Sequence, residues 1–190
     1  MSLTAFLALA ALAVGTCEPA RFAGPVAALG SAKSDARLAG VWSGHSASGE
    51  TLFLHVVPHG AEMDLVLVGT DAPGAMVLHY QGHAASFGNL NLLGLRSKRF
   101  PDPLREKFEL SADWIWVKYA LGSDGALQLS WVTSEGMSKA IAIGALKGSL
   151  TKAGVPRVSD SPAKVVTYLA SATDKTLWST LEPLRRLPTP

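Results

Sequence analysis

The sequence predicts an all-β domain, and three observations lead to that fold class. Short apolar segments with alternating side chains recur along the chain, and turn residues separate them about every 8–12 residues. No succession of strand–helix–strand units, which a parallel sheet would need, is present. We therefore expect an eight-stranded up-and-down barrel with a short inserted helix and a C-terminal helix, and a β-sandwich is the alternative fold.

The predicted barrel opens at the segment from Leu38 to Trp42. Gly40 and Trp42 lie on the same face of a strand, because side chains alternate from one face to the other. Glycine leaves room for a close approach, and an indole ring can fill that room. We therefore expect Trp42 in the core, at one end of the barrel.

Seven further strands follow along the chain. Each is an apolar or alternating run bounded by Gly, Pro, Asp, Asn or Ser, and several carry apolar residues on both faces. An outer face of that kind needs a helix or loop to cover it. The eight predicted strands cover residues 41–45, 50–57, 62–70, 76–84, 89–95, 113–121, 126–132 and 164–170.

Two helices complete the prediction. Residues 134–145 repeat apolar side chains at helical spacing, and Ser134 is the expected N-cap. The C-terminal helix is expected to begin at the capping residue Asp174 and to end at Pro183, since proline disrupts a helix interior. Between the fifth and sixth strands, two prolines in residues 96–107 exclude a central strand.

The first residues of the chain resemble an export signal. Residues 3–14 are apolar but too short to span a bilayer comfortably, and small residues follow them. The usual positively charged start is absent, because residues 1–4 contain no Lys or Arg. We expect residues 1–17 to direct export to the periplasm or cell envelope.

Cys17 is the only cysteine, and it directly follows this apolar stretch. The segment from Val14 to Cys17 resembles a bacterial lipobox, in which the cysteine becomes lipid-modified, although Thr16 departs from the usual Gly, Ala or Ser. Membrane anchoring through Cys17 is therefore expected, and ordinary cleavage after Gly15 is the alternative. Residues 18–37, rich in Ala, Gly, Pro and Ser, are expected to form a flexible tether ahead of a barrel domain at 38–187.

Composition excludes some classes of partner. The 190 residues suffice for one domain and a leader, and the formal net charge is only +2. No dense run of Lys and Arg is present, so a nucleic-acid partner is not expected.

Motifs for catalysis are weak. The segment from Gly44 to Gly49 nearly matches the nucleophile elbow of hydrolases, but Ser48 stands where the second glycine belongs, and a strand follows. It is interpreted as a hairpin turn. His79 and His83 share one strand face that is expected to face solvent, and no Asp, Glu or Cys of that strand completes a metal site. No catalytic residue, metal or cofactor is predicted.

Three tryptophans are the candidate ligand-binding residues. Trp114 and Trp116 share a face of one predicted strand, and Trp131 on the next strand is expected to stack across the hairpin. Such a cluster is either core or the lining of a pocket mouth. Together with Trp42, we assign Trp114 and Trp116 to a candidate site for a small apolar ligand.

The Leu38-x-Gly40-x-Trp42 motif, followed by this order of strands, resembles the opening of lipocalin-like proteins. The resemblance implies an eight-stranded barrel with a C-terminal helix against its wall, in a family that often binds small apolar molecules. Exported bacterial proteins of unknown function with a small lipocalin-like barrel are a closer likeness, and residues 136–146 and 165–187 resemble their last elements. The departures are Ala112, where lipocalins carry a threonine before the Asp-aromatic pair, and the lack of an obvious arginine to cover the tryptophan from the last strand.

These observations predict an exported, non-enzymatic barrel that binds a small apolar ligand. The alternative is a structural or envelope-interaction protein whose barrel is filled with side chains, and a hydrolase or metal-binding protein is a remote third. The volume of the inward-facing side chains would discriminate between the first two. Gly69, Gly82 and Gly94 stand among Leu, Val and Trp, so the sequence leaves both open.

Overall fold

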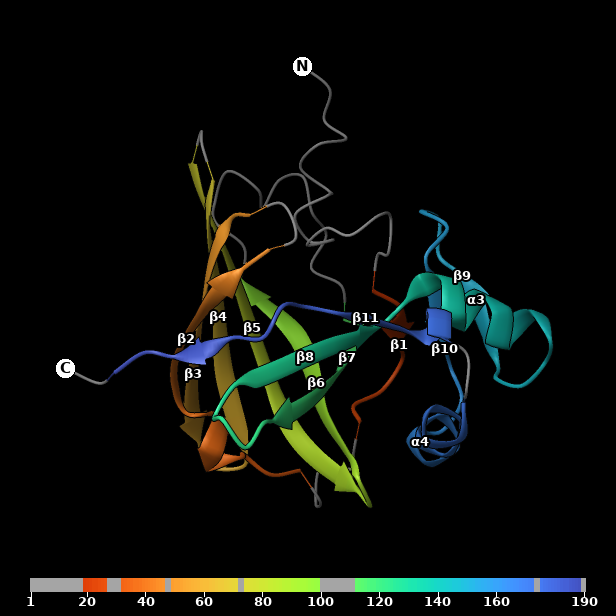
Figure 1. Ribbon diagram of the computed structural model, residues 1–190. Helices are drawn as coiled ribbons and strands as arrows, with labels where there is room; N and C mark the ends of the chain where they lie inside the picture. The colour runs from red at the N-terminus through yellow and green to blue at the C-terminus, as the bar shows by residue number, and fades with distance from the viewer. Residues whose placement is uncertain are drawn as a thin grey trace.

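The computed structural model describes residues 19–26, 32–46, 49–71, 74–99, 112–172 and 175–188. In these ranges the chain forms a curled antiparallel sheet of nine strands, a smaller sheet of three strands and two α-helices. The helices and the small sheet lie together on one side of the large sheet (Figure 1). The all-β class is thus confirmed in its coarse form, with nine strands in the main sheet rather than eight.

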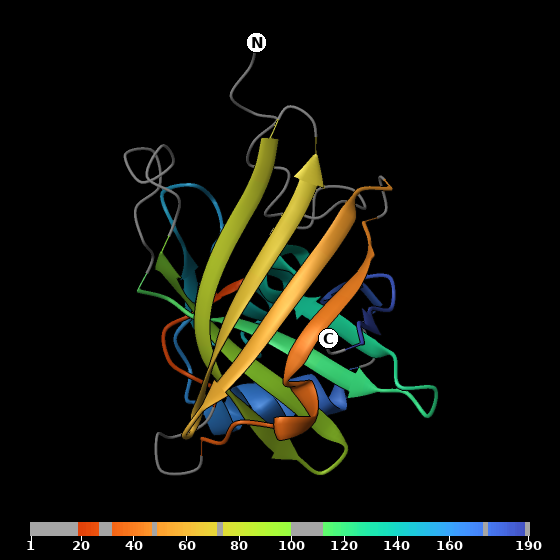
Figure 2. The same cartoon turned by 90° about the vertical axis from the view of Figure 1, so that its left-hand side faces the viewer.

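Seven strands of the large sheet follow one another as an antiparallel meander. Each pairs with the next along the chain, and positive-φ glycines such as Gly60 and Gly88 make the tight turns between them. Figure 2 shows the curl of strands β2 to β5. The seven strands are β2 (Gly40–His45), β3 (Thr51–His59), β4 (Glu62–Asp71), β5 (Gly74–Phe87), β6 (Leu90–Arg99), β7 (Ile115–Leu121) and β8 (Leu127–Val132).

One C-terminal segment forms both edges of this sheet. Strand β11 (Trp178–Thr180) pairs with β8, and strand β12 (Arg185–Arg186) pairs with β2. Between them, Leu184 and Leu127 exchange two backbone hydrogen bonds of 2.9 Å. The first and last strands of the meander are therefore connected through a single stretch of chain.

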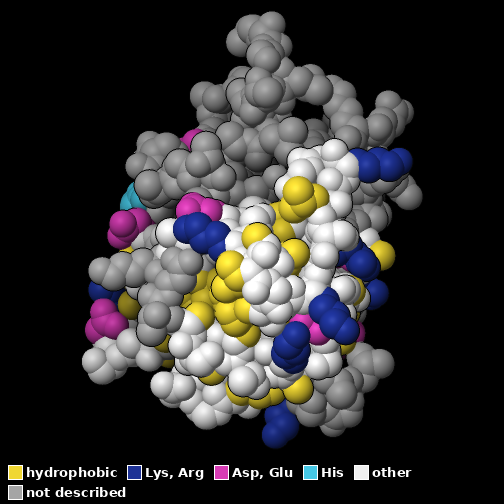
Figure 3. All heavy atoms as spheres, turned by 90° about the vertical axis from the view of Figure 1, so that its right-hand side faces the viewer, with side chains coloured by type: hydrophobic (Ala, Val, Ile, Leu, Met, Phe, Trp, Pro, Cys, Tyr) yellow, Lys and Arg dark blue, Asp and Glu magenta, His cyan; other side chains and the backbone are white. Residues whose placement is uncertain are grey.

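The small sheet packs on the outer face of the large one. Strand β1 (Arg21–Phe22) runs parallel to β10 (Pro156–Val158), which pairs with β9 (Gly148–Leu150). Helices α3 (Ser134–Ala142) and α4 (Pro162–Ser171) complete this layer. Seen from their side, the molecule shows hydrophobic patches between Lys and Arg side chains (Figure 3).

The large sheet separates two hydrophobic clusters. The inner cluster includes Trp42, Leu93 and Val117, and the outer cluster, under the helices, includes Leu92 and Trp116. Neighbouring residues on β6 and β7 fall into different clusters because side chains alternate along a strand. The expectation that strand 113–121 is covered on both faces is therefore confirmed.

Two of the predicted elements near the C-terminus are wrong. Residues 164–170 are not a strand but the body of α4, which begins with Ser161 as N-cap and Pro162 in the first turn. The expected helix from Asp174 to Pro183 is instead a 3₁₀ turn (Lys175–Leu177) followed by β11. The inserted helix is confirmed over Ser134–Ala142, although its N-cap is Thr133 and not Ser134.

The described part of residues 18–37, expected to be a flexible tether, is packed against the rest of the protein. Ala20, Phe22 and Val26 are buried, and Pro19 forms a β-bridge with Thr133. Apolar side chains that bury themselves against the sheet fix this segment, which overrides its Ala, Gly and Pro composition. Cys17 and the predicted signal lie outside the described residues. Among the described residues, no helix is both long and apolar enough to span a membrane.

Candidate functional site

Trp42 lies at the inner side of the sheet, where strands β2 and β12 meet. Its side chain is 1% exposed, and its indole Nε1 donates a hydrogen bond of 2.8 Å to the carbonyl of Leu38. The Arg186 guanidinium carbon stands 4.6 Å from the centre of the Trp42 ring, because Arg186 and Trp42 are paired in the strand register. The predicted core position of Trp42 is confirmed.

A polar triad lies next to this tryptophan. Asp35 caps the 3₁₀ turn Ala36–Leu38 and accepts hydrogen bonds from Arg37 through its backbone nitrogen at 3.0 Å, Nε at 3.0 Å and Nη2 at 2.7 Å. The Tyr119 hydroxyl donates to the same carboxylate at 2.9 Å. Arg186 in turn donates to the Arg37 carbonyl. This network joins the segment before β2 to β7 and to the C-terminal segment.

The triad has defined protonation states at neutral pH. The hydrogen bonds from Arg37 hold the pKa of Asp35 below its usual range, against the opposing effect of burial. Burial, together with the neighbouring Asp35, raises the pKa of Tyr119 to about 12. Asp35 is therefore a carboxylate whose charge Arg37 balances, and Tyr119 is a neutral hydroxyl.

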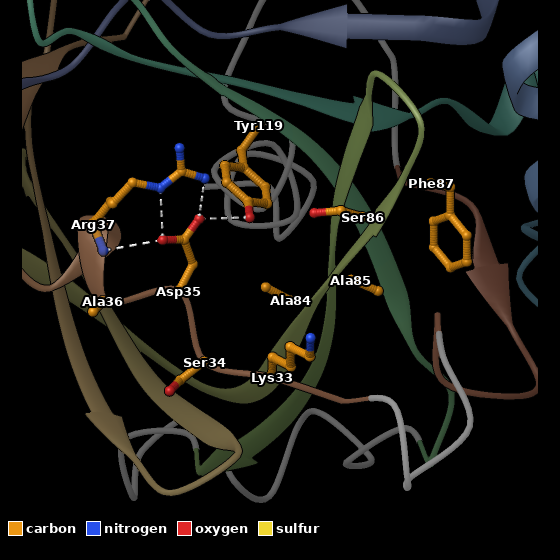
Figure 4. Close-up of a pocket in the computed structure, with 10 residues that line it drawn as sticks. All are labelled: Lys33, Ser34, Asp35, Ala36, Arg37, Ala84, Ala85, Ser86, Phe87 and Tyr119. Atoms are coloured by element: carbon orange, nitrogen blue, oxygen red, sulfur yellow. Dashed lines mark hydrogen bonds and ion pairs between the residues drawn. The ribbon is translucent and has the colours of Figure 1, made fainter.

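A groove of about 400 Å³ opens beside the triad, between the segment 33–37 and the end of β5 (Figure 4). Backbone hydrogen bonds between Lys33 and Ala84, of 3.2 and 2.7 Å, hold the two walls together. The Ser34 hydroxyl also donates to the Gly60 carbonyl at 2.8 Å, which ties this wall to the β3–β4 turn. Apolar and polar side chains share the lining: Lys33, Ser34, Asp35, Ala36, Arg37, Ala84, Ala85, Ser86, Phe87 and Tyr119.

Lys33 is the charged residue of this groove that no described residue neutralises. Its ammonium makes no hydrogen bond or ion pair with any residue that the structure describes, whereas Arg37 and Asp35 neutralise each other. Figure 4 shows its side chain reaching toward the β5 wall. The groove therefore carries a net positive charge beside the apolar Ala84 and the ring of Tyr119.

No family model, curated protein or solved structure matches this chain. Its function is therefore inferred from the geometry of the site.

The three tryptophans assigned to one site are not brought together. Trp116 belongs to the outer cluster, on the opposite side of the sheet from Trp42, and stacks on Phe22 with ring centres 4.5 Å apart. Trp114 is half-buried on the same outer face. Trp131 packs on the inner cluster, since it pairs with Val117, so its predicted stacking with Trp114 and Trp116 is wrong.

The prediction that His79 and His83 both face solvent is wrong for His83. His79 is half-buried and lies 3.2 Å from a carboxylate oxygen of Asp64, as a surface residue would. His83, on the same face of β5, is only 1% exposed and packs edge-on against Trp114. Val26, which packs on the neighbouring Gly94, is distant in sequence, so strand periodicity alone could not reveal this burial. No group of three or more potential metal ligands occurs among the described side chains.

Ser46 has the structural role predicted for it. Its hydroxyl accepts a hydrogen bond from the Glu50 backbone nitrogen at 3.1 Å, and its own nitrogen donates to the Glu50 carbonyl at 2.8 Å. Both contacts close the turn between β2 and β3. The hairpin interpretation is confirmed.

Sequence reasoning missed the residues of the groove. Lys33 and Asp35 fall in the segment expected to be a tether, and Arg186 follows the expected end of the C-terminal helix at Pro183. Tyr119 carried a usable signal, because it shares strand parity with the inward-facing Val117. The Asp35-x-Arg37 spacing is also a local capping pattern.

Proposed function

We propose that this protein is an exported, non-enzymatic, lipocalin-like barrel that binds a small amphipathic molecule with an anionic group. The groove beside Tyr119 carries the proposal. Its volume of about 400 Å³ falls within the range of small-molecule sites, which combine apolar walls with a few polar groups. The C-terminal segment that bonds to both β8 and β2 supports the closed barrel of this proposal.

The charge of the ligand follows from the groove's own charges. Lys33 lacks a partner among the described residues, while the charge of Asp35 is balanced by Arg37. A carboxylate or sulfonate would gain an ion pair with Lys33, whereas an ammonium would meet repulsion. The apolar part would contact Ala84 and the ring of Tyr119.

A structural role is the second candidate, and the packing of the inner face favours it. Large side chains, including Trp42, Met63 and Tyr119, are buried together there. An inner face so occupied resembles the filled barrel of a structural or envelope-interaction protein. Ala84 and Tyr119 belong to this packed region and also line the groove, so ligand binding at the groove distinguishes the two candidates.

The test is a matched set of ligands. Octanoate, octanol and octylammonium share one chain length and differ in charge, and their binding can be followed by NMR shifts of the amides around Ala84 and Tyr119. We expect octanoate to bind most tightly, and Lys33→Ala to weaken octanoate about tenfold, as the loss of one charge-assisted contact does. Lys152→Ala, an exposed lysine distant from the groove in sequence, is the control.

Two outcomes would contradict the proposal. Absence of binding by all three compounds would favour the structural candidate. Equal binding of octanoate and octylammonium would remove Lys33 as the determinant of ligand charge.

A further inference from the structure

Residues 19–26, which we name the N-terminal strap, lie across the outer face of the large sheet. Phe22 and Trp114 exchange backbone hydrogen bonds of 2.9 and 2.8 Å, and the nitrogens of Ala20 and Ala23 donate to Val132 and Val158, each at 2.9 Å. These bonds attach the strap to β8, to β10 and to the start of β7.

Side chains strengthen this attachment. The Phe22 ring stacks on Trp116 with an interplanar angle of 14°. The indole Nε1 of Trp116 donates to the Gly24 carbonyl at 3.2 Å. The strap is thus held by one aromatic stack and by a side-chain hydrogen bond in addition to its backbone bonds.

The far end of the strap packs against Gly94, the cross-strand neighbour of His83. In the register of β5, β6 and β7, His83 pairs with Gly94, and Gly94 pairs with Trp116, so all three share the outer face. A Cβ on Gly94 would stand 3.1 Å from the Val26 nitrogen and from its Cγ1. Val26, which is 0% exposed, therefore occupies the space that Gly94 leaves open beside His83.

The Nε2 atom of His83 is buried without a hydrogen-bond partner among the described residues. The side chain is 1% exposed, and its ring centre lies 5.3 Å from that of Trp114. A neutral imidazole tolerates this site, but an imidazolium would be a buried charge without a close counter-ion. Burial accordingly lowers the pKa of His83, with a smaller opposing effect from Glu62.

The charged groups on the surrounding elements do not supply a close counter-ion. Glu62 on β4 receives a hydrogen bond of 2.6 Å from Gln81. Arg96 on β6 lies over the Trp114 ring at 5.3 Å and would repel an imidazolium. Asp113, next to Trp114, is paired with Arg157 of β10 at 2.8 Å, and Arg21 on the strap adds another positive charge.

We propose that His83 is a proton-sensitive latch for the N-terminal strap, which stays on the sheet while His83 is neutral and is released when His83 becomes protonated. Release hydrates the imidazolium by removing Val26 from beside it. It also uncovers the apolar surface made by Phe22, Trp116 and Ala20.

The pH direction follows from linkage. A histidine whose pKa is lowered in the closed state binds its proton more readily in the open state, so acid favours opening. The strap is attached most strongly above the open-state pKa of His83, about 6.5. Its attachment weakens progressively as the pH falls from there toward the lower closed-state pKa.

Hydrogen exchange of single amides tests the latch. Protection factors, corrected for the intrinsic pH dependence of exchange, are compared at about pH 7.5 and pH 5, on either side of the ordinary histidine pKa. We expect the Ala20, Phe22 and Ala23 amides to lose protection by up to about tenfold per pH unit between the open-state pKa of about 6.5 and the lower closed-state pKa, because only in that range does one state bind the proton and the other not. Amides of β3 and β4 report global unfolding and are expected to keep their protection.

Variants isolate His83 from other titrating groups. His83→Phe and His83→Gln cannot protonate and should abolish the pH-dependent loss, and either one suffices if the other fails to fold. His79→Gln, on the same strand face, should retain it. In the wild-type protein, NMR titration should give a His83 pKa below about 6.5.

The latch is overturned if strap protection is equal at both pH values or if its loss persists in a His83 variant. Loss shared equally by β3 and β4 would show global unfolding and would also overturn it. A measured His83 pKa at or above the ordinary value would have the same consequence.

Discussion

The Arg186 guanidinium covers the face of Trp42, with its central carbon 4.6 Å from the ring centre. Trp42 belongs to β2, and Arg186 belongs to the C-terminal strand β12. An arginine that covers the tryptophan from the last strand is the feature of lipocalins for which the sequence offered no obvious match. The contact is therefore compatible with a lipocalin-like barrel, and it fixes the C-terminal strand β12 to β2.

Trp42→Ala should strongly destabilise the protein. The side chain is fully buried and its Nε1 is hydrogen-bonded, so the variant loses both a large apolar contact and a satisfied polar group. We expect the free energy of unfolding to fall by about 3–5 kcal/mol, measured by urea denaturation. Trp178→Ala, at a half-buried indole, should cost clearly less. An unchanged midpoint in Trp42→Ala would contradict the core role of this residue.

Arg186→Ala should cost about 0.5–1 kcal/mol, the usual contribution of an exposed cation–π contact. Its neighbour Arg185 provides the control, because it is equally part of β12 but pairs with the exposed Asp124. Surface ion pairs contribute little, so Arg185→Ala is expected to be near neutral. The two variants can be compared by thermal melts. Equal effects would show that the contact with Trp42 adds nothing to stability.

The meander could be predicted from sequence because its strands are local patterns with turn residues at their ends. The strand predicted at residues 164–170 rests on the β-branched Val165 and Val166. The structure instead follows the helix cap at Ser161 and the proline after it. The segment is helical because Val165, Val166 and Leu169 bury one helix face against the outer cluster. Propensity is a weak guide where tertiary packing is strong.

The groove and the strap could not be predicted in the same way. Phe22 is buried only because Trp116 lies beneath it, and Val26 because Gly94 lacks a side chain. These partners are separated by most of the domain, and strand register brings them together. Composition indicated a tether because it reports local preference and not long-range contacts.

Gly94→Ala should weaken the attachment of the strap. The added methyl would stand 3.1 Å from the Val26 backbone nitrogen, which is tighter than ordinary contact, and the strap would have to move outward. A cost of about 1–3 kcal/mol is expected, as for overpacked cores, and it can be measured by chemical denaturation. Gly24→Ala is the matched control, since its Cβ would meet no atom within 4 Å. Equal stabilities would contradict the close packing at Gly94.

Asp35→Asn should remove a stabilising contribution that the wild-type protein loses only in acid. The pKa of Asp35 is lowered in the folded protein by the Arg37 hydrogen bonds, so its contribution is present above the unfolded value of about 3.9 and is lost as the pH falls further. The wild-type melting temperature should exceed that of Asp35→Asn at pH 6, and the difference should shrink in acid. Glu135→Gln, at an exposed helical pair, should show no such difference. A constant difference across pH would contradict the ionised role of Asp35.

The last prediction concerns Cys17 and export. A lone cysteine after an apolar leader motivates the hypothesis that mature protein carries acyl chains there and partitions with membranes. Two or more chains are needed for stable anchoring, because each buried CH₂ contributes about 0.8 kcal/mol and one chain alone binds only marginally. Only Glu18 separates Cys17 from the packed Pro19, so an anchored domain would sit close to the bilayer while the strap is attached.

Cys17→Ser should move the same folded domain to the soluble fraction, and labelled palmitate should mark only the wild-type chain. A wild-type protein that takes up no label would refute lipidation. A mature protein that keeps residue 1 when its N-terminus is analysed would refute export.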